Sequence, residues 1–460
     1  KTEVNPPRSE ALYQSAKKIY PREIKGRFAT LSKIATNVLL GLFYIVPWLT
    51  WDDRQAILFD LPARKFYLQG LTLWPQDFLY LALLLIIAAI SLFFFTALGG
   101  RLWCGFACPQ TVWTEAFIWM EQWTEGTRSQ RMKLDKAPWS WNKLRRKGSK
   151  QILWITFSLW TGFTFVGYFQ PIRDLGVEIL ALNVGGWTRF WGFFYGFATY
   201  GNAGYMREQV CKYMCPYARF QSAMFDRDTL IISYDESRGE PRGGRKRSVD
   251  REAAGLGDCI DCQLCVQVCP TGIDIRDGLQ YECIACAACI DACDSIMDKM
   301  DDPRGLVRYT TEHALDGQET RVLRPRTVVY ASLLTVLFAG MMLSMFTRTP
   351  LILDVIRDRN ELYRELADGS VENAYTLKVI NQSNETRQFE LSVAGAEGLE
   401  LEGVSNPVSV DGGGVLNLPV RARLTRDGAY GMMDISFTAT ATDDPNVAVV
   451  ENSRFIGPSR

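Results

Sequence analysis

The segments CIDCQLCVQVCP, residues 259–270, and CIACAACIDACD, residues 283–294, hold eight of the twelve cysteines in this 460-residue chain. Both have the spacing C-x2-C-x2-C-x3-C. In the bacterial run of this spacing, the fourth cysteine of each segment serves the cluster bound by the first three cysteines of the other segment. The spacing therefore predicts a two-cluster ferredoxin-like domain. One [4Fe-4S] cluster is expected on Cys259, Cys262, Cys265 and Cys293, and the other on Cys269, Cys283, Cys286 and Cys289.

Zinc is the alternative metal that such a cysteine-rich segment could bind. Zinc ribbons usually carry two separated C-x2-C pairs, and mixed sites add histidine. The single histidine of the chain, His313, lies outside both segments. The spacing therefore favours iron-sulfur clusters, and a membrane haem held by two histidines is excluded.

The composition indicates a membrane protein with two compartments. A formal net charge of zero argues against nucleic acid as a partner. All thirteen tryptophans lie before residue 192, which is typical of a membrane-embedded first half with indoles at the interfaces. No cysteine follows Cys293, so we expect the remainder to lie where thiols would be oxidised.

Five uncharged or nearly uncharged runs predict a bundle of about five membrane-spanning helices. The first is read as a retained helix, because a cleavable signal peptide would place its apolar stretch nearer the start. The fourth is interrupted by Arg189 and several glycines, so a re-entrant or interfacial segment is its alternative. The predicted spans are 34–51, 78–98, 152–169, 187–205 and 327–347.

The distribution of Lys and Arg predicts the orientation of these spans. Segments 1–33, 99–150 and 206–326 carry 8, 10 and 17 of them, whereas the short loops 52–77 and 171–186 carry 3 and 1. The positive-inside rule then places the first three segments, with both clusters, in the cytoplasm, and the C-terminal domain in the periplasm. The basic stretch 239–250 in the third segment is expected to be a flexible, solvated linker that contacts anionic lipid.

The last part of the chain predicts an immunoglobulin-like β-sandwich. Tyr375, Leu377 and Val379 alternate with polar residues, and similar short runs recur up to residue 442 between turn residues. The predicted organisation is a cytoplasmic segment 1–33, a membrane domain 34–226, a ferredoxin-like domain 227–326, a fifth span 327–347 and a periplasmic immunoglobulin-like domain 348–460.

The four remaining cysteines form a repeated C-x3-C-P motif. Cys104 and Cys108 follow the second span, and Cys211 and Cys215 follow the fourth. Each motif precedes an amphipathic stretch, so we interpret span, motif and surface helix as an internal repeat about a pseudo-twofold axis. The proline of each motif is expected to open the surface helix. Cys108 and Cys215 would then lie at helix N-termini, where the dipole lowers a thiol's pKa.

Three interpretations of this motif remain open from the residues alone. Four thiolates with a thioether suit Cu(I), which makes the four cysteines candidate catalytic and copper-binding residues, with Met214 as an accessory ligand. They could equally hold another metal or act as two redox dithiols. The alternative is that they are small buried residues at helix ends.

The order of these motifs resembles the cytochrome c oxidase accessory proteins of the FixG/CcoG family. The resemblance covers essentially the whole chain and is most specific in WCGFACPQTVWTE, residues 103–115, and in the paired cluster motif. It implies an inner-membrane protein that assists assembly of a C-type haem-copper oxidase and reduces Cu(II) to Cu(I). The core also looks like the membrane ferredoxin subunits of periplasmic nitrate reductase.

The function predicted from these observations is membrane-bound iron-sulfur electron transfer from a cytosolic donor to copper at the C-x3-C-P motifs. The expected partners are that donor, oxidase assembly factors or copper chaperones, membrane lipid and a second copy of the chain in a homodimer. One rival hypothesis is an assembly scaffold whose clusters sense redox state. Another is a quinol-linked relay subunit.

Overall fold

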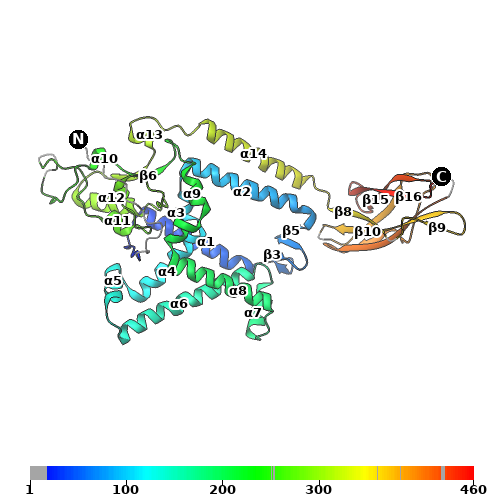
Figure 1. The fold of residues 1–460 in the computed structure, drawn as a ribbon, viewed down its shortest axis with the longest axis horizontal. Helices are drawn as coiled ribbons and strands as arrows, with labels where there is room; N and C mark the ends of the chain where they lie inside the picture. Colours follow the sequence, from blue (N-terminus) through cyan, green and yellow to red (C-terminus); the bar gives the residue numbers. More distant parts are fainter. Residues whose placement is uncertain are drawn as a thin grey trace. The chain divides into compact units, whose positions relative to one another are not determined.

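The computed structural model divides the chain into two compact units, residues 1–338 and 339–460, and each is described by itself. The structure describes residues 18–459, except 250, 252, 253, 360, 384 and 426–429. The helices drawn in Figure 1 begin with α1, and most of them lie in the first unit. Their bounds are α1 Arg27–Ile45, α2 Phe78–Gly99, α3 Leu102–Phe106, α4 Pro109–Glu125, α5 Arg128–Lys136, α6 Trp141–Val166, α7 Ile172–Leu180, α8 Gly186–Thr199, α9 Pro216–Ser222, α10 Glu236–Gly239, α11 Leu264–Val268, α12 Ala288–Met300, α13 Glu312–Leu315 and α14 Pro325–Phe346.

Three helices among the described residues are long and apolar enough to cross a bilayer. They are α1 with its 3₁₀ extension η1 (Val46–Trp48), α2 and α14. Large apolar side chains on them are exposed, for example Phe78 at 68% and Leu343 at 66%. Exposure of such large apolar surfaces to water is unfavourable, so these helices indicate that the protein is associated with a membrane.

The predicted count of five spans is not confirmed. The third predicted span falls in α6, whose first third is basic, and the fourth begins in α8. The α-helical part of the fourth ends after 14 residues, because the chain continues as a π-helix, η3 (Tyr200–Met206). A second π-helix, η4 (Val210–Met214), follows.

Helices α6 and α8 lie side by side in Figure 1 and touch through glycine. A Cβ atom on Gly162 would collide with the carbonyl oxygen of Gly192, and one on Gly196 would lie 3.2 Å from the carbonyl oxygen of Ser158. Such close approach between small residues is typical of helix pairs in membranes. The outer face of α8 remains exposed and aromatic, as at Trp187 and Phe197.

The predicted cluster segment folds around two short helices and a two-stranded sheet. Strands β6 (Ile231–Tyr234) and β7 (Val307–Thr310) pair antiparallel, with Tyr234 opposite Val307. Their apolar side chains pack with α12, and the 3₁₀ turn η5 (Ile275–Asp277) closes the core. The buried residues of this core are Ile232, Tyr234, Ile275, Ala285, Ala287, Ile290, Met297, Leu306 and Val307.

The first membrane helix is fixed to this core. The carboxylate of Asp291, on α12, accepts hydrogen bonds from the backbone N–H groups of Phe28 (3.2 Å) and Ala29 (2.7 Å). These amides have no partner within α1, and a carboxylate there also complements the helix dipole. The start of α1 and the cluster segment are therefore one packed body.

The basic stretch 239–250 differs from the expected flexible linker. The N–H of Gly243 donates to the carbonyl oxygen of Cys259 at 3.0 Å, and the guanidinium of Arg245 pairs with Asp302. The stretch is therefore attached to the first cluster segment over its described part. Composition alone could not indicate this, because both partners are distant in sequence.

A set of short strands between α1 and α2 was not predicted from the sequence. These strands are β1 (Thr50–Trp51), β2 (Arg54–Gln55), β3 (Ile57–Asp60), β4 (Lys65–Leu68) and β5 (Leu71–Leu73). They pair as β1-β2 and β3-β4-β5.

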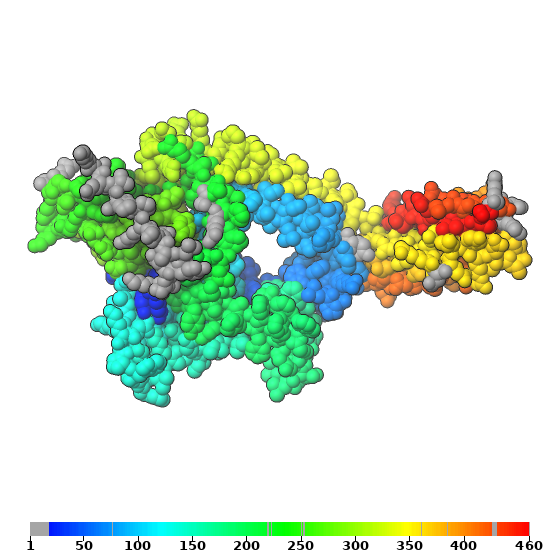
Figure 2. Space-filling view, viewed as in Figure 1, coloured from blue at the N-terminus to red at the C-terminus, as the bar shows by residue number. Residues whose placement is uncertain are grey.

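The second unit contains the predicted sandwich, which is confirmed. One sheet has the order β12-β14-β10-β8, with β9 on β10, and the other has the order β13-β11-β15-β16. Figure 2 shows the red strands near the C-terminus lying against the yellow strands around β10, and Tyr375 packs edge-on against Phe437 between the sheets. The strands are β8 Leu351–Arg357, β9 Arg364–Glu365, β10 Val371–Asn381, β11 Arg387–Ala394, β12 Glu400–Glu402, β13 Val408–Val410, β14 Val415–Leu424, β15 Met432–Ala441 and β16 Ala448–Ile456.

Candidate iron-sulfur and thiol site

The two cluster segments have the same unusual backbone. Asp261 and Gln263 have φ angles of 51° and 55°, and the equivalent Ala285 and Ala287 have 55° and 60°. The left-handed region costs a residue with a Cβ atom roughly 1–2 kcal/mol. Its recurrence at matching positions indicates that both loops curve around the same kind of group.

Four cysteines line a first cavity. Cys259, Cys262 and Cys265 come from the first loop, and Cys293 reaches it from α12. Tyr234, Leu264 and Met297 are among the residues that complete the wall. Cys262 is the one exposed cysteine of the twelve, so this cavity lies nearest to solvent.

The other four cluster cysteines line a second cavity. Cys283, Cys286 and Cys289 come from the second loop, and Cys269 comes from the end of the first. Cys265 also borders this cavity, which places the two cavities next to each other. The structure thus groups the eight cysteines in the crossed arrangement that the spacing predicts.

The donor set fits iron-sulfur clusters. Among the described residues, each cavity is lined by at least four cysteines and by no histidine or carboxylate, which matches the thiolate ligands of a [4Fe-4S] cluster. The N–H of Ala285 donates to Sγ of Cys283 at 3.4 Å, a contact that stabilises a thiolate. Burial raises the pKa of Cys265 to about 11 and that of Cys293 to about 12, so their thiolates depend on a bound cationic centre.

The two C-x3-C-P motifs occupy the predicted places at helix starts. Pro109 opens α4 and Pro216 opens α9, with Cys108 and Cys215 as the preceding N-cap residues. Cys104 lies in α3, whereas Cys211 lies in the π-helix η4. The order of motif and following helix is therefore repeated, although α9 has 7 residues and α4 has 17.

The four thiols are gathered into one group. Burial is the main cause that raises the pKa of Cys211 to about 12, and the nearby Cys108, Cys104 and Cys215 raise it further. Burial also raises the pKa of Cys104 to about 11, and the side-chain amide Nε2 of the buried Gln221 donates to its Sγ at 3.5 Å. These effects require the four sulfur atoms to lie within electrostatic reach of one another.

The predicted lowering of the thiol pKa at a helix N-terminus is wrong for Cys108. Burial raises the pKa of this thiol, and the hydrogen bonds from the backbone N–H groups of Gln110 and Thr111 offset the rise only in part. Desolvation therefore outweighs the helix N-terminus. The accessory candidate Met214 lies at the end of η4 with 55% of its surface exposed.

The first C-x3-C-P motif touches the second cluster loop. Gly105 lies between Cys104 and Cys108, and a Cβ atom there would be 2.8 Å from the carbonyl oxygens of both Ile284 and Ala285. Only a residue without a side chain permits this backbone-to-backbone contact. The contact joins helix α3, between two candidate copper ligands, to a loop between two candidate cluster ligands.

Arg101 spans the same boundary. Its Nη1 donates to the carbonyl oxygens of Tyr281 and Cys283, the latter at 3.2 Å, and its Nη2 donates to the carbonyl oxygen of Ala218 at 3.0 Å. The side chain is only 6% exposed. One buried cation is therefore bound to the second cluster loop and to the helix that follows the second C-x3-C-P motif.

Comparison with known proteins identifies the relatives of this chain. It is 40% identical to protein RdxB and 39% identical to protein RdxA, both of Cereibacter sphaeroides. These matches cover 87% of this chain and 87% of RdxB, and 97% of this chain and 94% of RdxA. It is 38% identical to the nitrogen fixation protein FixG of Rhizobium meliloti over 84% of this chain and 80% of that protein. The chain belongs to the FixG family.

Family models match three parts of this FixG-family chain. A 4Fe-4S dicluster domain matches residues 206–312, a 4Fe-4S binding domain matches residues 81–126, and an immunoglobulin-like fold at the C-terminus of FixG matches residues 341–458. A crystal structure of a FixG-related protein from Vibrio parahaemolyticus is 35% identical and covers 24% of this chain and 96% of that chain, with a TM-score of 0.22. This FixG-family member is a membrane-associated iron-sulfur electron-transfer protein.

A buried ion network behind the motifs was not predicted from the sequence. Glu121, which is fully buried, accepts hydrogen bonds from Arg207 at 2.8 Å and from Arg131 at 3.2 Å. Burial alone would raise the pKa of Glu121, but the charges of Arg207 and Lys18 hold it at about 2. Arg207 also donates to the carbonyl oxygen of Gly204, so this network fixes the approach to Cys211 in the FixG-family fold. A polar residue on the inner face of α4 is the one signal that could have revealed it.

Proposed function

We propose that this FixG-family protein reduces Cu(II) to Cu(I) at Cys104, Cys108, Cys211 and Cys215, for assembly of a C-type haem-copper cytochrome c oxidase. The contact of Gly105 with Ile284 and Ala285 carries the proposal. It brings the segment that carries Cys104 and Cys108 against the second cluster loop, with no side chain between the two backbones. Such a contact suits electron transfer between the two groups of cysteines.

Eight cysteines would hold the two clusters that carry the electrons. Cys259, Cys262, Cys265 and Cys293 would hold the outer cluster, and Cys269, Cys283, Cys286 and Cys289 the inner one. When bound, each cluster supplies one electron at a time, which matches the one-electron reduction of Cu(II).

The four thiols of the C-x3-C-P motifs favour the product. Thiolates are soft ligands that prefer Cu(I), so they stabilise the reduced ion relative to Cu(II). Because burial raises the pKa of Cys104 and Cys211, copper binding must release their protons. Met214 keeps its predicted role as an accessory thioether on the exposed side of the site.

The proposed location is the bacterial cytoplasmic membrane, with segment 1–33 and both clusters in the cytoplasm and the immunoglobulin-like domain in the periplasm. The charge count supports this orientation. The glycine contact between α6 and α8 supports a spanning hairpin in addition to the three longer apolar helices. The proposed partners are a donor on the cytosolic side, oxidase assembly factors or copper chaperones, membrane lipid and a second copy of the chain.

The test is replacement of all four C-x3-C-P cysteines by serine in the purified full-length chain. Serine keeps the volume but removes the soft ligand, so Cu(II) reduction by the dithionite-reduced protein should be lost while iron content stays unchanged. Formation of Cu(I) is followed with a Cu(I)-specific chelator, and reoxidation of the clusters by their absorbance. Unimpaired reduction in the quadruple variant would remove these cysteines from the mechanism. If oxidase assembly in cells survived this change but failed without residues 370–460, the scaffold hypothesis would be favoured.

A further inference from the structure

A cavity of about 180 Å³ lies between the two groups of cysteines in the first unit. Cys286 of the inner cluster group lines it on one side, and Cys211 of the C-x3-C-P group lines it on another. Its walls come from the segment before α1, from α1, α3 and α4, from the stretch that includes Cys211 in η4, and from both cluster segments. No other cavity described above touches both groups.

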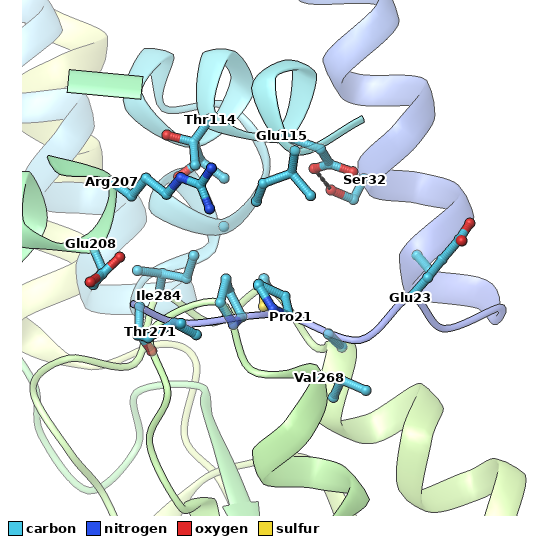
Figure 3. Close-up of a pocket in the computed structure, with 18 of the residues that line it drawn as sticks. Pro21, Glu23, Ser32, Thr114, Glu115, Arg207, Glu208, Val268, Thr271 and Ile284 are labelled. Carbon is cyan, nitrogen blue, oxygen red and sulfur yellow. Dashed lines mark hydrogen bonds between the residues drawn. The ribbon is translucent and has the colours of Figure 1, made fainter. Parts of the chain in front are cut away.

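The lining of this cavity suits an apolar ring with a polar edge. Most of the wall is apolar, with Ile19, Ile24, Ile118, Trp119, Val268 and Ile284 as the larger side chains. Figure 3 shows Glu115 on α4 turned toward Ser32 on α1, whose Oγ donates to the carboxylate at 2.8 Å. A cavity of roughly 150 Å³ admits one benzene ring, so this one is large enough for a substituted six-membered ring.

The cavity lies at the mouth of the first membrane helix. Ser32 and Lys33 line it, and Lys33 is the last charged residue before the uncharged run that starts at Ile34. One residue of helix rises by about 1.5 Å, so the polar edge is within one turn of the point where α1 enters hydrocarbon. The cavity is therefore at a depth that a lipid-soluble ring can reach.

We propose that this cavity binds the ring of a membrane quinone and exchanges electrons with the inner cluster through the wall that contains Cys286. This inference rests on the proposed function in one respect, since it connects the same clusters to the quinone pool. In the oxidising direction, one hydroquinone would give one electron to each of two [4Fe-4S] clusters and become a quinone. Its first hydroxyl proton would pass to the carboxylate of Glu115, and the second to water at the rim.

The position of Glu115 fits a proton acceptor. Burial raises the pKa of this carboxyl, and the hydrogen bond from Ser32 and the charge of Lys33 oppose the rise. A carboxyl with a pKa moved toward neutrality can both accept a proton from a hydroxyl and return it. An acyl chain has no polar group that could bond to this pair, whereas the hydroxyl of a quinol has one.

The primary test is binding of the fluorescent quinone-site ligand 2-heptyl-4-hydroxyquinoline N-oxide to the full-length, cluster-loaded protein in detergent. We expect saturable quenching with one site per chain and competition by decylubiquinone. Thr114→Phe places a ring in the cavity and should weaken binding by about tenfold or more. Thr335→Phe, on the exposed face of α14, is the matched control and should not change it.

The second test follows electrons. Clusters reduced with dithionite and freed of excess reductant should be reoxidised by decylubiquinone, and Thr114→Phe should slow this step while Thr335→Phe leaves it unchanged. Glu115→Gln should retain ligand binding but slow reoxidation, with Glu319→Gln as its control. Absence of saturable binding, or equal behaviour of Thr114→Phe and the parent protein, would refute the quinone site. Copper reduction driven by dithionite is measured on the same samples, and its persistence would leave the proposed function intact.

Discussion

Replacement of Arg101 offers a quantitative test of the coupling between the two redox groups. Its guanidinium is buried and is bonded to the carbonyl oxygen of Cys283, within the inner cluster loop. A unit charge roughly 6–10 Å away, at an effective dielectric of about 20, stabilises an added electron by roughly 1.7–2.8 kcal/mol, which is about 70–120 mV for a one-electron couple. Arg101→Gln should therefore lower the reduction potential of the inner cluster by that amount.

The assay is a redox titration followed by EPR, in which both clusters of one sample are measured together. The outer cluster should change much less, because the hydrogen bonds of Arg101 to described residues reach the second cluster loop and α9 and not the first loop. Arg101→Lys retains the charge but not the forked geometry, so it should keep most of the potential while weakening the loop contact. Arg64→Gln, on the exposed β3–β4 turn, is the control for a lost surface charge.

Two results would refute this reasoning. If Arg101→Gln left the potential of the inner cluster unchanged, the buried charge would not act on that cluster. If Arg101→Lys shifted the potential as far as Arg101→Gln does, the cause would be the geometry of the loop and not the charge.

Other predictions address the clusters, the topology and the buried network. Iron and acid-labile sulfide should each be about eight per chain, and stoichiometric zinc without iron would contradict the cluster assignment. Cys293→Ser should damage the cluster bound by Cys259 and its two neighbours, and EPR damage confined to the other cluster would show that the ligation is not crossed. A reporter fused after residue 460 should be active in the periplasm and one inserted near Gly244 in the cytoplasm, and identical locations would mean that a span has been misread. Glu121→Gln should lower the free energy of unfolding by roughly 3–5 kcal/mol, because Arg207 and Arg131 lose a buried anion; an unchanged thermal transition relative to the exposed control Glu319→Gln would contradict this.

Local patterns predicted the features that depend on local spacing. Cysteine spacing indicated two cluster loops, proline after cysteine indicated the starts of α4 and α9, and alternation near Tyr375 indicated β10. Local patterns could not predict the contacts of Gly105 and Arg101 with the second cluster loop, because these contacts join residues about 180 positions apart in sequence.

Three further differences between prediction and structure have a similar origin. The short strands between α1 and α2 have only two to four residues each, too few for a pattern of alternation. The pKa of Cys108 was misjudged because a helix N-terminus is visible in the sequence, whereas the burial that opposes it is not. The fourth span could not be counted securely, because the sequence does not reveal that its helix changes to a π-helix at Tyr200.

The meeting of α6 and α8 at Gly162 also has an evolutionary consequence. Every other amino acid carries a Cβ atom, and at this position that atom would collide with the carbonyl oxygen of Gly192. Each missense change in the codon of Gly162 would thus push the helix pair apart, even though this residue binds no ion and moves no electron. Among related genes we expect Gly162 to be conserved as strongly as the cysteines. Its conservation would then reflect the packing of the two helices and not a role in metal binding or electron transfer.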